Sequence, residues 1–148
     1  MKTSEEIVLT AMRGLGRADA LSLRQRANDM TGTEVIVEEE KVPTWAADKD
    51  YSDYPVGAPV QHDGQVYKLL QPHNPAHYPD STPADSPVLW GLCHTTDPSR
   101  AKPYITSLGT SGLYYKDECC IVDGIVYRCI VDSTDHSPTA WPQGWEEV

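Results

Sequence analysis

Aromatic residues in polar stretches are the side chains of this sequence most suited to binding chemistry. An aromatic face packs against the apolar side of a pyranose ring, and neighbouring planar polar groups can bind the ring's hydroxyls. Five aromatic and three polar residues qualify: Tyr51, Tyr54, Tyr78, Tyr115 and Trp141, with Gln71, His73 and Asn74. Tyr78, in a proline-rich loop, is the strongest single candidate for sugar contact.

The sequence gives little support for a catalytic or metal-binding site. His73 and His77 have a spacing that binds zinc on a helix, but three prolines within and beside the pair exclude that helix. No nucleophile elbow, zinc-protease motif or phosphate-binding loop occurs. The glutamates at 38–40 are typical of a solvated face, and two small modules hardly provide the cleft that glycoside hydrolysis needs. We predict no enzyme activity, no metal site and no cofactor.

The cysteines also fit no zinc pattern; they are Cys93, Cys119, Cys120 and Cys129. If residues 123–124 form a two-residue hairpin turn, Cys120 lies opposite Tyr127, and Cys119 points to the other face. Cys120 and Cys129 are then diagonal neighbours, at about 7 Å between Cβ atoms against the roughly 4 Å that a disulfide needs. We predict free thiols in core positions, which suits synthesis in a reducing cytoplasm.

Composition favours turn-rich β structure. The 148 residues are 39% hydrophobic, with 12 Pro, 10 Gly and no Phe, which suits two small cores better than one large core. A net charge of −10 disfavours nucleic acid and anionic membranes as partners, and no apolar stretch approaches the roughly 18 residues of a spanning helix. The first residues lack the features of a signal peptide, so we expect release by lysis or as part of a particle.

An internal repeat dominates the second half of the chain. Residues 60–70 recur as residues 120–130, and each copy carries an Asp-Gly pair between apolar runs, at Asp63-Gly64 and Asp123-Gly124. This pair is a strong signal for a hairpin with a type I′ turn. Each copy ends at a tryptophan, and the predicted core residues are Trp45, Val60, Tyr67, Trp90, Cys120, Tyr127 and Trp145. Such small cores need support from a neighbour.

The N-terminal segment reads as helical. Thr3 and Glu6 form a capping box ahead of a short apolar run at Ile7, Leu9 and Met12. Residues 17–30 predict a second helix with an apolar face at Ala18, Leu21 and Ala27, which residues 31–33 end. Residues 34–41 fit either a strand or a helix. Because large apolar residues are few, we expect this segment to dock onto another chain or to self-associate.

The first copy resembles carbohydrate-binding module families 5 and 12, the short chitin-binding domains. The residues that carry the resemblance are Trp45, Tyr51 or Tyr54, Val56-Gly57, Val60, Asp63-Gly64, Val66-Tyr67 and Trp90. The resemblance implies a small three-stranded antiparallel fold that binds insoluble polysaccharide through exposed aromatics. Those domains carry adjacent aromatics after the hairpin tyrosine, where this chain has Leu69, Leu70 and Gln71, with Ile130 and Val131 in the second copy. Chitin binding therefore does not follow, and Tyr104 is the nearest substitute for the leading tryptophan in the second copy.

The arrangement also resembles small tail-associated proteins of phages and prophages. These combine an Asp-Ala-Leu-x-Leu-Arg stretch, here Asp19–Arg24, with an acidic linker and a Pro-x-Trp, here Pro43-Thr44-Trp45. We therefore predict a mainly β chain: a helical and acidic segment at 1–41, a β-module at 42–97 and a divergent β-module at 98–148, each module three-stranded and antiparallel.

The predicted function is a non-enzymatic structural virion protein of a phage-like tail. It would contact other tail proteins through residues 1–41 and present its modules to host-surface glycan or to protein partners. Homo-oligomers or several copies per particle are expected, since weak sugar contacts gain from multivalency. The alternative is a free carbohydrate-binding protein that assists a glycoside hydrolase.

Overall fold

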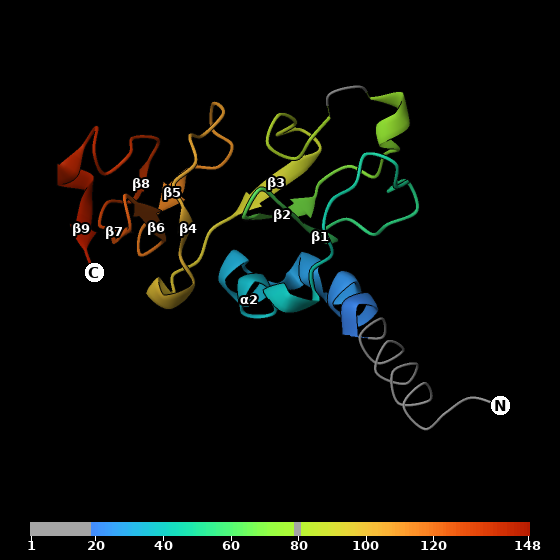
Figure 1. The fold of residues 1–148 in the computed structure, drawn as a ribbon, viewed down its shortest axis with the longest axis horizontal. Helices are drawn as coiled ribbons and strands as arrows, with labels where there is room; N and C mark the ends of the chain where they lie inside the picture. The colour runs from blue at the N-terminus through green and yellow to red at the C-terminus, as the bar shows by residue number, and fades with distance from the viewer. Residues whose placement is uncertain (1–18, 79–80) are drawn as a thin grey trace.

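The computed structural model of the chain describes residues 19–78 and 81–148 and combines a helical N-terminal segment with three small sheets (Figure 1). Helical turns are frequent between the short strands, so the fold is mixed rather than mainly β. The predicted capping box at Thr3 and Glu6, its apolar run and Ala18 lie outside the described residues.

From residue 19 onward, where the structure describes it, the N-terminal segment contains four helical pieces. Residues 19–26 are helical, followed by η1 (Ala27–Asp29), α2 (Gly32–Val37) and η2 (Glu39–Lys41). Thr31 caps α2, because its hydroxyl accepts from the Glu34 amide at 3.2 Å while the Glu34 carboxylate accepts from the Thr31 amide at 3.0 Å. Residues 31–33 therefore begin a helix instead of merely ending one, and the helical alternative for residues 34–41 is the right one.

The apolar face of residues 19–29 includes Ala27 as predicted, but its other member is Leu23 and not Leu21. Leu21 is 48% exposed, whereas Leu23 and Ala27 are completely buried. Residues four apart share a helix face, and it is the Leu23–Ala27 pair that turns toward the first sheet.

The strands form sheets of three, four and two members. The first sheet is β1 (Pro59–His62), β2 (Gln65–Leu69) and β3 (Trp90–Cys93). The second sheet has the order β4 (Lys102–Pro103), β6 (Cys119–Val122), β7 (Ile125–Cys129) and β9 (Trp145–Glu147). β5 (Tyr114–Tyr115) pairs with β8 (Ser133–Thr134), and three 3₁₀ turns complete the fold: η3 (Pro75–His77), η4 (Pro98–Arg100) and η5 (Pro142–Gly144).

The two predicted hairpins have identical register. Val60 faces Tyr67 in β1–β2, and Cys120 faces Tyr127 in β6–β7. Asp63 and Asp123 have φ of 49° and 51°, and the glycine after each has φ of 78°, as a type I′ turn requires. The closing tryptophans also correspond, since Leu69 faces Trp90 and Cys129 faces Trp145. The predicted hairpin register is confirmed.

Each module has one more pairing than the predicted three antiparallel strands. β4 runs parallel to β6, and Thr44 makes a parallel bridge to Gln61 in the first module. The amides of Trp45 and Tyr104 donate to the carbonyls of Gln61 and Ile121, both at 2.9 Å, so Tyr104 takes the place of Trp45. These short segments cover the otherwise unpaired edge of each hairpin. A three-stranded antiparallel module was therefore an incomplete prediction.

Two of the apolar clusters correspond between the modules. The first contains Val60, Tyr67 and Trp90, and the second contains Cys120, Cys129 and Trp145; all six are buried. Trp45 and Tyr127, also predicted as core, are only partly buried against these clusters. All four cysteines are buried as free thiols.

The N-terminal segment covers the other face of the first sheet (Figure 1). Its buried residues Leu23, Ala27, Val35 and Ile36 form a third cluster with Val42 and with Val66 and Cys93 of the sheet. Successive residues of a strand point to opposite faces, so β2 contributes Val66 to this cluster and Tyr67 to the other. The sequence predicts docking onto another chain, but this apolar face is already occupied by the chain itself.

Two glycines allow the N-terminal segment to come close. At Gly57, which has φ of 92°, a Cβ would lie 2.4 Å from the Asn28 Cα. At Gly32, a Cβ would lie 2.5 Å from the carbonyl oxygen of His94. Any larger residue at either position would push the N-terminal segment away from the first module.

Contacts also cross the predicted domain boundaries at 41/42 and 97/98. The Glu39 carboxylate pairs with the Lys102 ammonium group at 2.6 Å, and the side-chain Nε2 of Gln65 donates to the Pro103 carbonyl at 2.7 Å. The His94 ring stacks on Tyr114 with 3.7 Å between ring centroids. The divisions at 41/42 and 97/98 stay predictions, and packing is continuous across both.

Candidate functional site

The strongest candidate site is a hollow at the end of the second module, with Trp141 as one wall. Its volume is about 440 Å³, and it is lined by Ser133, Thr134, Asp135, His136, Ala140 and Trp141. The His136 ring meets Trp141 edge-on, with ring centroids 6.1 Å apart, and its Nε2 lies 3.3 Å from Asp135 Oδ1. An aromatic wall beside a carboxylate, an imidazole and hydroxyls provides the groups that sugar recognition requires.

Hydrogen bonds hold the backbone of this hollow in place. The His136 amide donates to the Thr134 hydroxyl at 3.0 Å, and the Tyr104 hydroxyl donates to the Asp135 carbonyl at 3.2 Å. The indole N–H of the closing Trp145 donates to the His136 carbonyl at 3.0 Å. Because Trp145 is itself part of the core, the polar wall is fixed to the rigid part of the module.

The Trp141 indole is supported from behind by Gly144. A Cβ at Gly144 would lie 2.5 Å from two carbons of the six-membered ring. The backbone leading into Trp141 is closed by bonds from the Ala140 and Trp141 amides to Ser137 at 3.0 and 2.9 Å. The side chain is therefore positioned before any ligand arrives, which lowers the entropy cost of binding.

Tyr115 lies on the strand that pairs with Ser133 and Thr134, but it is not among the residues that line the hollow. It faces Ser133 in the β5–β8 pair and is 55% exposed. Residues directly opposite on paired strands project from the same face. The structure thus places Trp141 at the hollow and Tyr115 opposite the lining residue Ser133. It adds four polar residues that sequence reasoning missed: Ser133, Thr134, Asp135 and His136.

The candidates in the first module fall into two groups. Tyr51 and His73 are buried: the Tyr51 hydroxyl accepts from the Ala46 amide at 3.1 Å, and His73 Nδ1 donates to the Gln71 carbonyl at 2.8 Å. Arg24 covers the Tyr54 ring, with its guanidinium carbon 4.0 Å from the ring centroid. These three rings are occupied by the protein's own packing.

The remaining first-module candidates lie on the surface. Tyr78 is 51% exposed and packs edge-on against His73, with 5.9 Å between centroids. The Asn74 side chain caps η3 by accepting from the Ala76 backbone amide at 3.0 Å, and the side-chain Nε2 of Gln71 donates to the Val88 carbonyl at 3.0 Å. Tyr78 is thus a single exposed ring on a loop.

The two modules differ at the position of Trp141. In the first module, the turn before the closing Trp90 is held by the Leu89 amide, which donates to the Ser86 carbonyl. In the second module, the turn before the closing Trp145 is held in the same way by the Gly144 amide, which donates to the Trp141 carbonyl. Ser86 therefore stands in the first module where Trp141 stands in the second. An alignment of the two loops backward from the closing tryptophans would have found this difference in the sequence.

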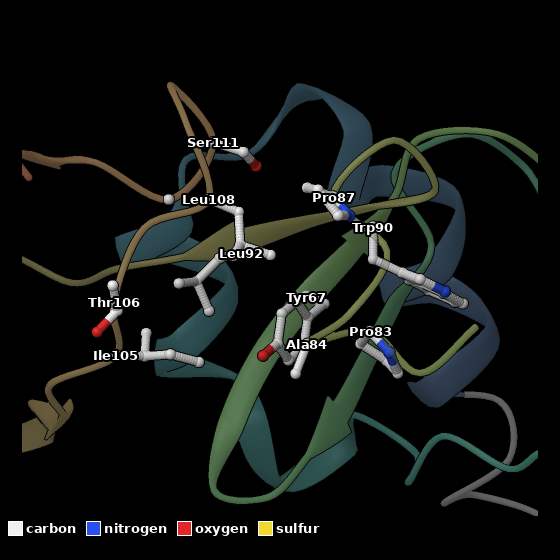
Figure 2. Close-up of a pocket in the computed structure, with 11 residues that line it drawn as sticks. Tyr67, Pro83, Ala84, Pro87, Trp90, Leu92, Ile105, Thr106, Leu108 and Ser111 are labelled. Carbon is white, nitrogen blue, oxygen red and sulfur yellow. The ribbon is translucent and has the colours of Figure 1, made fainter. Parts of the chain in front are cut away.

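A separate cavity at the junction of the modules is too small for a sugar. Figure 2 shows Tyr67 and Leu92 of the first sheet beside Ile105 and Leu108 of the connecting segment. The cavity measures about 20 Å³, which is room for about one water molecule. The buried Tyr67 hydroxyl has no hydrogen-bond partner among the described residues, and burial raises the pKa of Tyr67 to about 12.

Among residues 19–78 and 81–148, no three His, Cys, Asp or Glu side chains are grouped so that they could hold a metal ion. No helix in this part of the chain combines the length and apolarity needed to cross a bilayer. Scans of the sequence against protein-family models and curated proteins find no match. The candidate site therefore stands on its own geometry.

Proposed function

We propose that this chain is a non-enzymatic glycan-binding protein whose second module holds the sugar site. The observation that carries the proposal is the hollow in which Trp141 lies beside Asp135 and His136 on hydrogen-bonded backbone. A pyranose ring would pack on the indole, and its hydroxyls would bind Ser133, Asp135 and His136.

We further propose that the protein acts as a structural component of a phage-like tail. The sequence resemblance at Asp19–Arg24 and Pro43–Trp45 supports this setting. The buried face of residues 19–41 is used within the chain, so contact with other tail proteins falls to the outer surface of this segment or to residues 1–18. Detection of the chain in purified tail particles by mass spectrometry tests this setting, and its recovery only as free protein would favour the accessory-protein alternative.

The binding test uses the full chain on a glycan array and on cell-wall preparations. Wild type, Trp141→Ala, Gly144→Ala and Tyr78→Ala are compared. We expect Trp141→Ala to weaken binding about tenfold, which corresponds to 1.4 kcal/mol. Gly144→Ala keeps the indole but pushes it from its support, so it should weaken binding as well. Tyr78→Ala is the matched loss of an exposed aromatic in the other module.

Three outcomes separate the possibilities. Weakened binding in both second-module variants, with Tyr78→Ala unchanged, supports the proposed site. Loss of binding only in Tyr78→Ala would move the site to the first module. Absence of saturable binding to every sugar and wall preparation would overturn the glycan-binding proposal.

A further inference from the structure

The hollow around Trp141 carries a carboxylate, and this restricts the charge of the glycan that it can bind. Asp135 lines the hollow, and the Nε2 atom of His136 lies 3.3 Å from its Oδ1. Both side chains are well exposed to solvent. A ligand group can therefore reach the carboxylate of Asp135 without entering the core.

The surrounding module provides little positive charge to offset this carboxylate. Residues 98–148 contain seven acidic and four basic residues. Three of the four basic side chains are paired: Arg100 and Lys102 with Glu39, and Arg128 with Glu146. The fourth is Lys116, whose backbone amide donates to the Asp132 carbonyl, and the next residue is Asp117. The second module therefore carries an excess of acidic side chains, in keeping with the net charge of −10 of the whole chain.

We propose that this hollow selects amino sugars with a free, protonated amine over their N-acetylated forms, and that it rejects uronic acids. The inference rests on the proposed glycan-binding function. With the pyranose on Trp141, an ammonium group beside Asp135 forms a charged hydrogen bond in the place of His136. A carboxylate on the sugar would instead add a second negative charge next to Asp135 and be repelled.

The size of the preference follows from the exposure of Asp135. Ion pairs at exposed sites are weak, so we expect the free amine to improve affinity only about two- to fivefold. Salt screens exposed charges within about 10 Å at 0.1 M ionic strength, so the preference should shrink in high salt. Contact with the indole does not depend on salt in this way.

The test measures binding of the full chain to glucosamine, N-acetylglucosamine and galacturonic acid oligomers of equal length, at a pH where the sugar amine is charged. The variants are Asp135→Asn, Asp123→Asn and Trp141→Ala. Asp123→Asn removes the same charge from the same module at an exposed turn, where φ of 51° also suits asparagine. It therefore controls for the general effect of net charge.

We expect Asp135→Asn to abolish the preference for glucosamine over N-acetylglucosamine, and Asp123→Asn to keep that preference. Equal binding of all three oligomers to wild type, with Trp141→Ala weakening each, would overturn the charge selection and leave the proposed function standing. An equal loss of preference in both aspartate variants would also overturn it, because net charge and not Asp135 would then be responsible. Failure of all three oligomers to bind, while the chain binds other sugars on the array, would overturn the charge selection and leave the proposed function standing.

Discussion

Replacing Gly57 with alanine tests whether the N-terminal segment is an integral part of the first module. Gly57 is buried and has φ of 92°, and a Cβ there would lie 2.4 to 2.6 Å from three backbone and side-chain atoms of Asn28. Gly64→Ala is a matched control, since Gly64 has φ of 78° and a Cβ would meet nothing within 4 Å. Both variants strain the backbone, but only one pushes on the helical segment.

The expected magnitudes follow from this comparison. A left-handed conformation costs a non-glycine residue about 1–2 kcal/mol, which sets the loss for Gly64→Ala. Gly57→Ala adds displacement of Asn28, which pulls at the neighbouring Leu23 and Ala27, both completely buried. Exposing one leucine costs about 1.5–3 kcal/mol, so the free energy of unfolding should fall by about 3–5 kcal/mol in Gly57→Ala.

Equilibrium urea unfolding measures both losses, and amide hydrogen exchange of residues 19–29 reports whether the segment opens. We expect faster exchange there in Gly57→Ala and no change in Gly64→Ala. Equal destabilisation of the two variants within about 0.5 kcal/mol, with unchanged exchange, would refute the packing of this segment against the first module.

Three further predictions concern a cap, a buried histidine and the closing tryptophans. Thr31→Ala breaks the capping box of α2 and should lower the free energy of unfolding by about 0.5–2 kcal/mol in urea titrations, whereas the exposed Thr139→Ala should change little. Burial lowers the pKa of His94 from 6.5 to about 4, so the folded state binds fewer protons than the unfolded state between these values. Stability should therefore fall by about 3 kcal/mol as the pH drops from 6.5 to 4, and His94→Gln should flatten that slope. Trp145→Phe leaves the His136 carbonyl without its donor and should cost about 1–3 kcal/mol more than Trp90→Phe, whose indole N–H has no partner among the described residues; equal losses in thermal unfolding would contradict this.

The hairpins could be predicted because their determinants are local. An Asp-Gly pair fixes the turn, the turn fixes the register, and the register then places Val60 against Tyr67 and Cys120 against Tyr127. The exchange of Trp45 for Tyr104 was also visible, since both precede a hairpin at a similar distance. The parallel pairings of Thr44 and of β4 were not predictable, because segments of one or two residues carry no alternating pattern.

The packing of the N-terminal segment was missed for a different reason. Its cluster uses Leu23, Ala27, Val35 and Ile36, few enough to look insufficient for a core, and the sheet supplies Val66 and Cys93 from far along the chain. The candidate site could be predicted in part. Tyr115 and Trp141 are recognisable as aromatics in polar stretches, but the burial of Tyr51 and His73 depends on tertiary packing that no local pattern records.

The four buried thiols can report local opening of the fold, because a thiol reacts only when it becomes exposed. Burial raises the pKa of Cys93 and of Cys120 to about 12 and also raises the pKa values of Cys119 and Cys129, so all four are protonated and unreactive in the folded state. Cys93 belongs to the cluster under the N-terminal segment, and Cys120 and Cys129 belong to the core of the second module. Cys119 lies at the junction, where its backbone amide donates to the Thr95 carbonyl. The order in which an alkylating reagent labels the four thiols would therefore rank the free energies of local opening of these three regions in the unmodified protein.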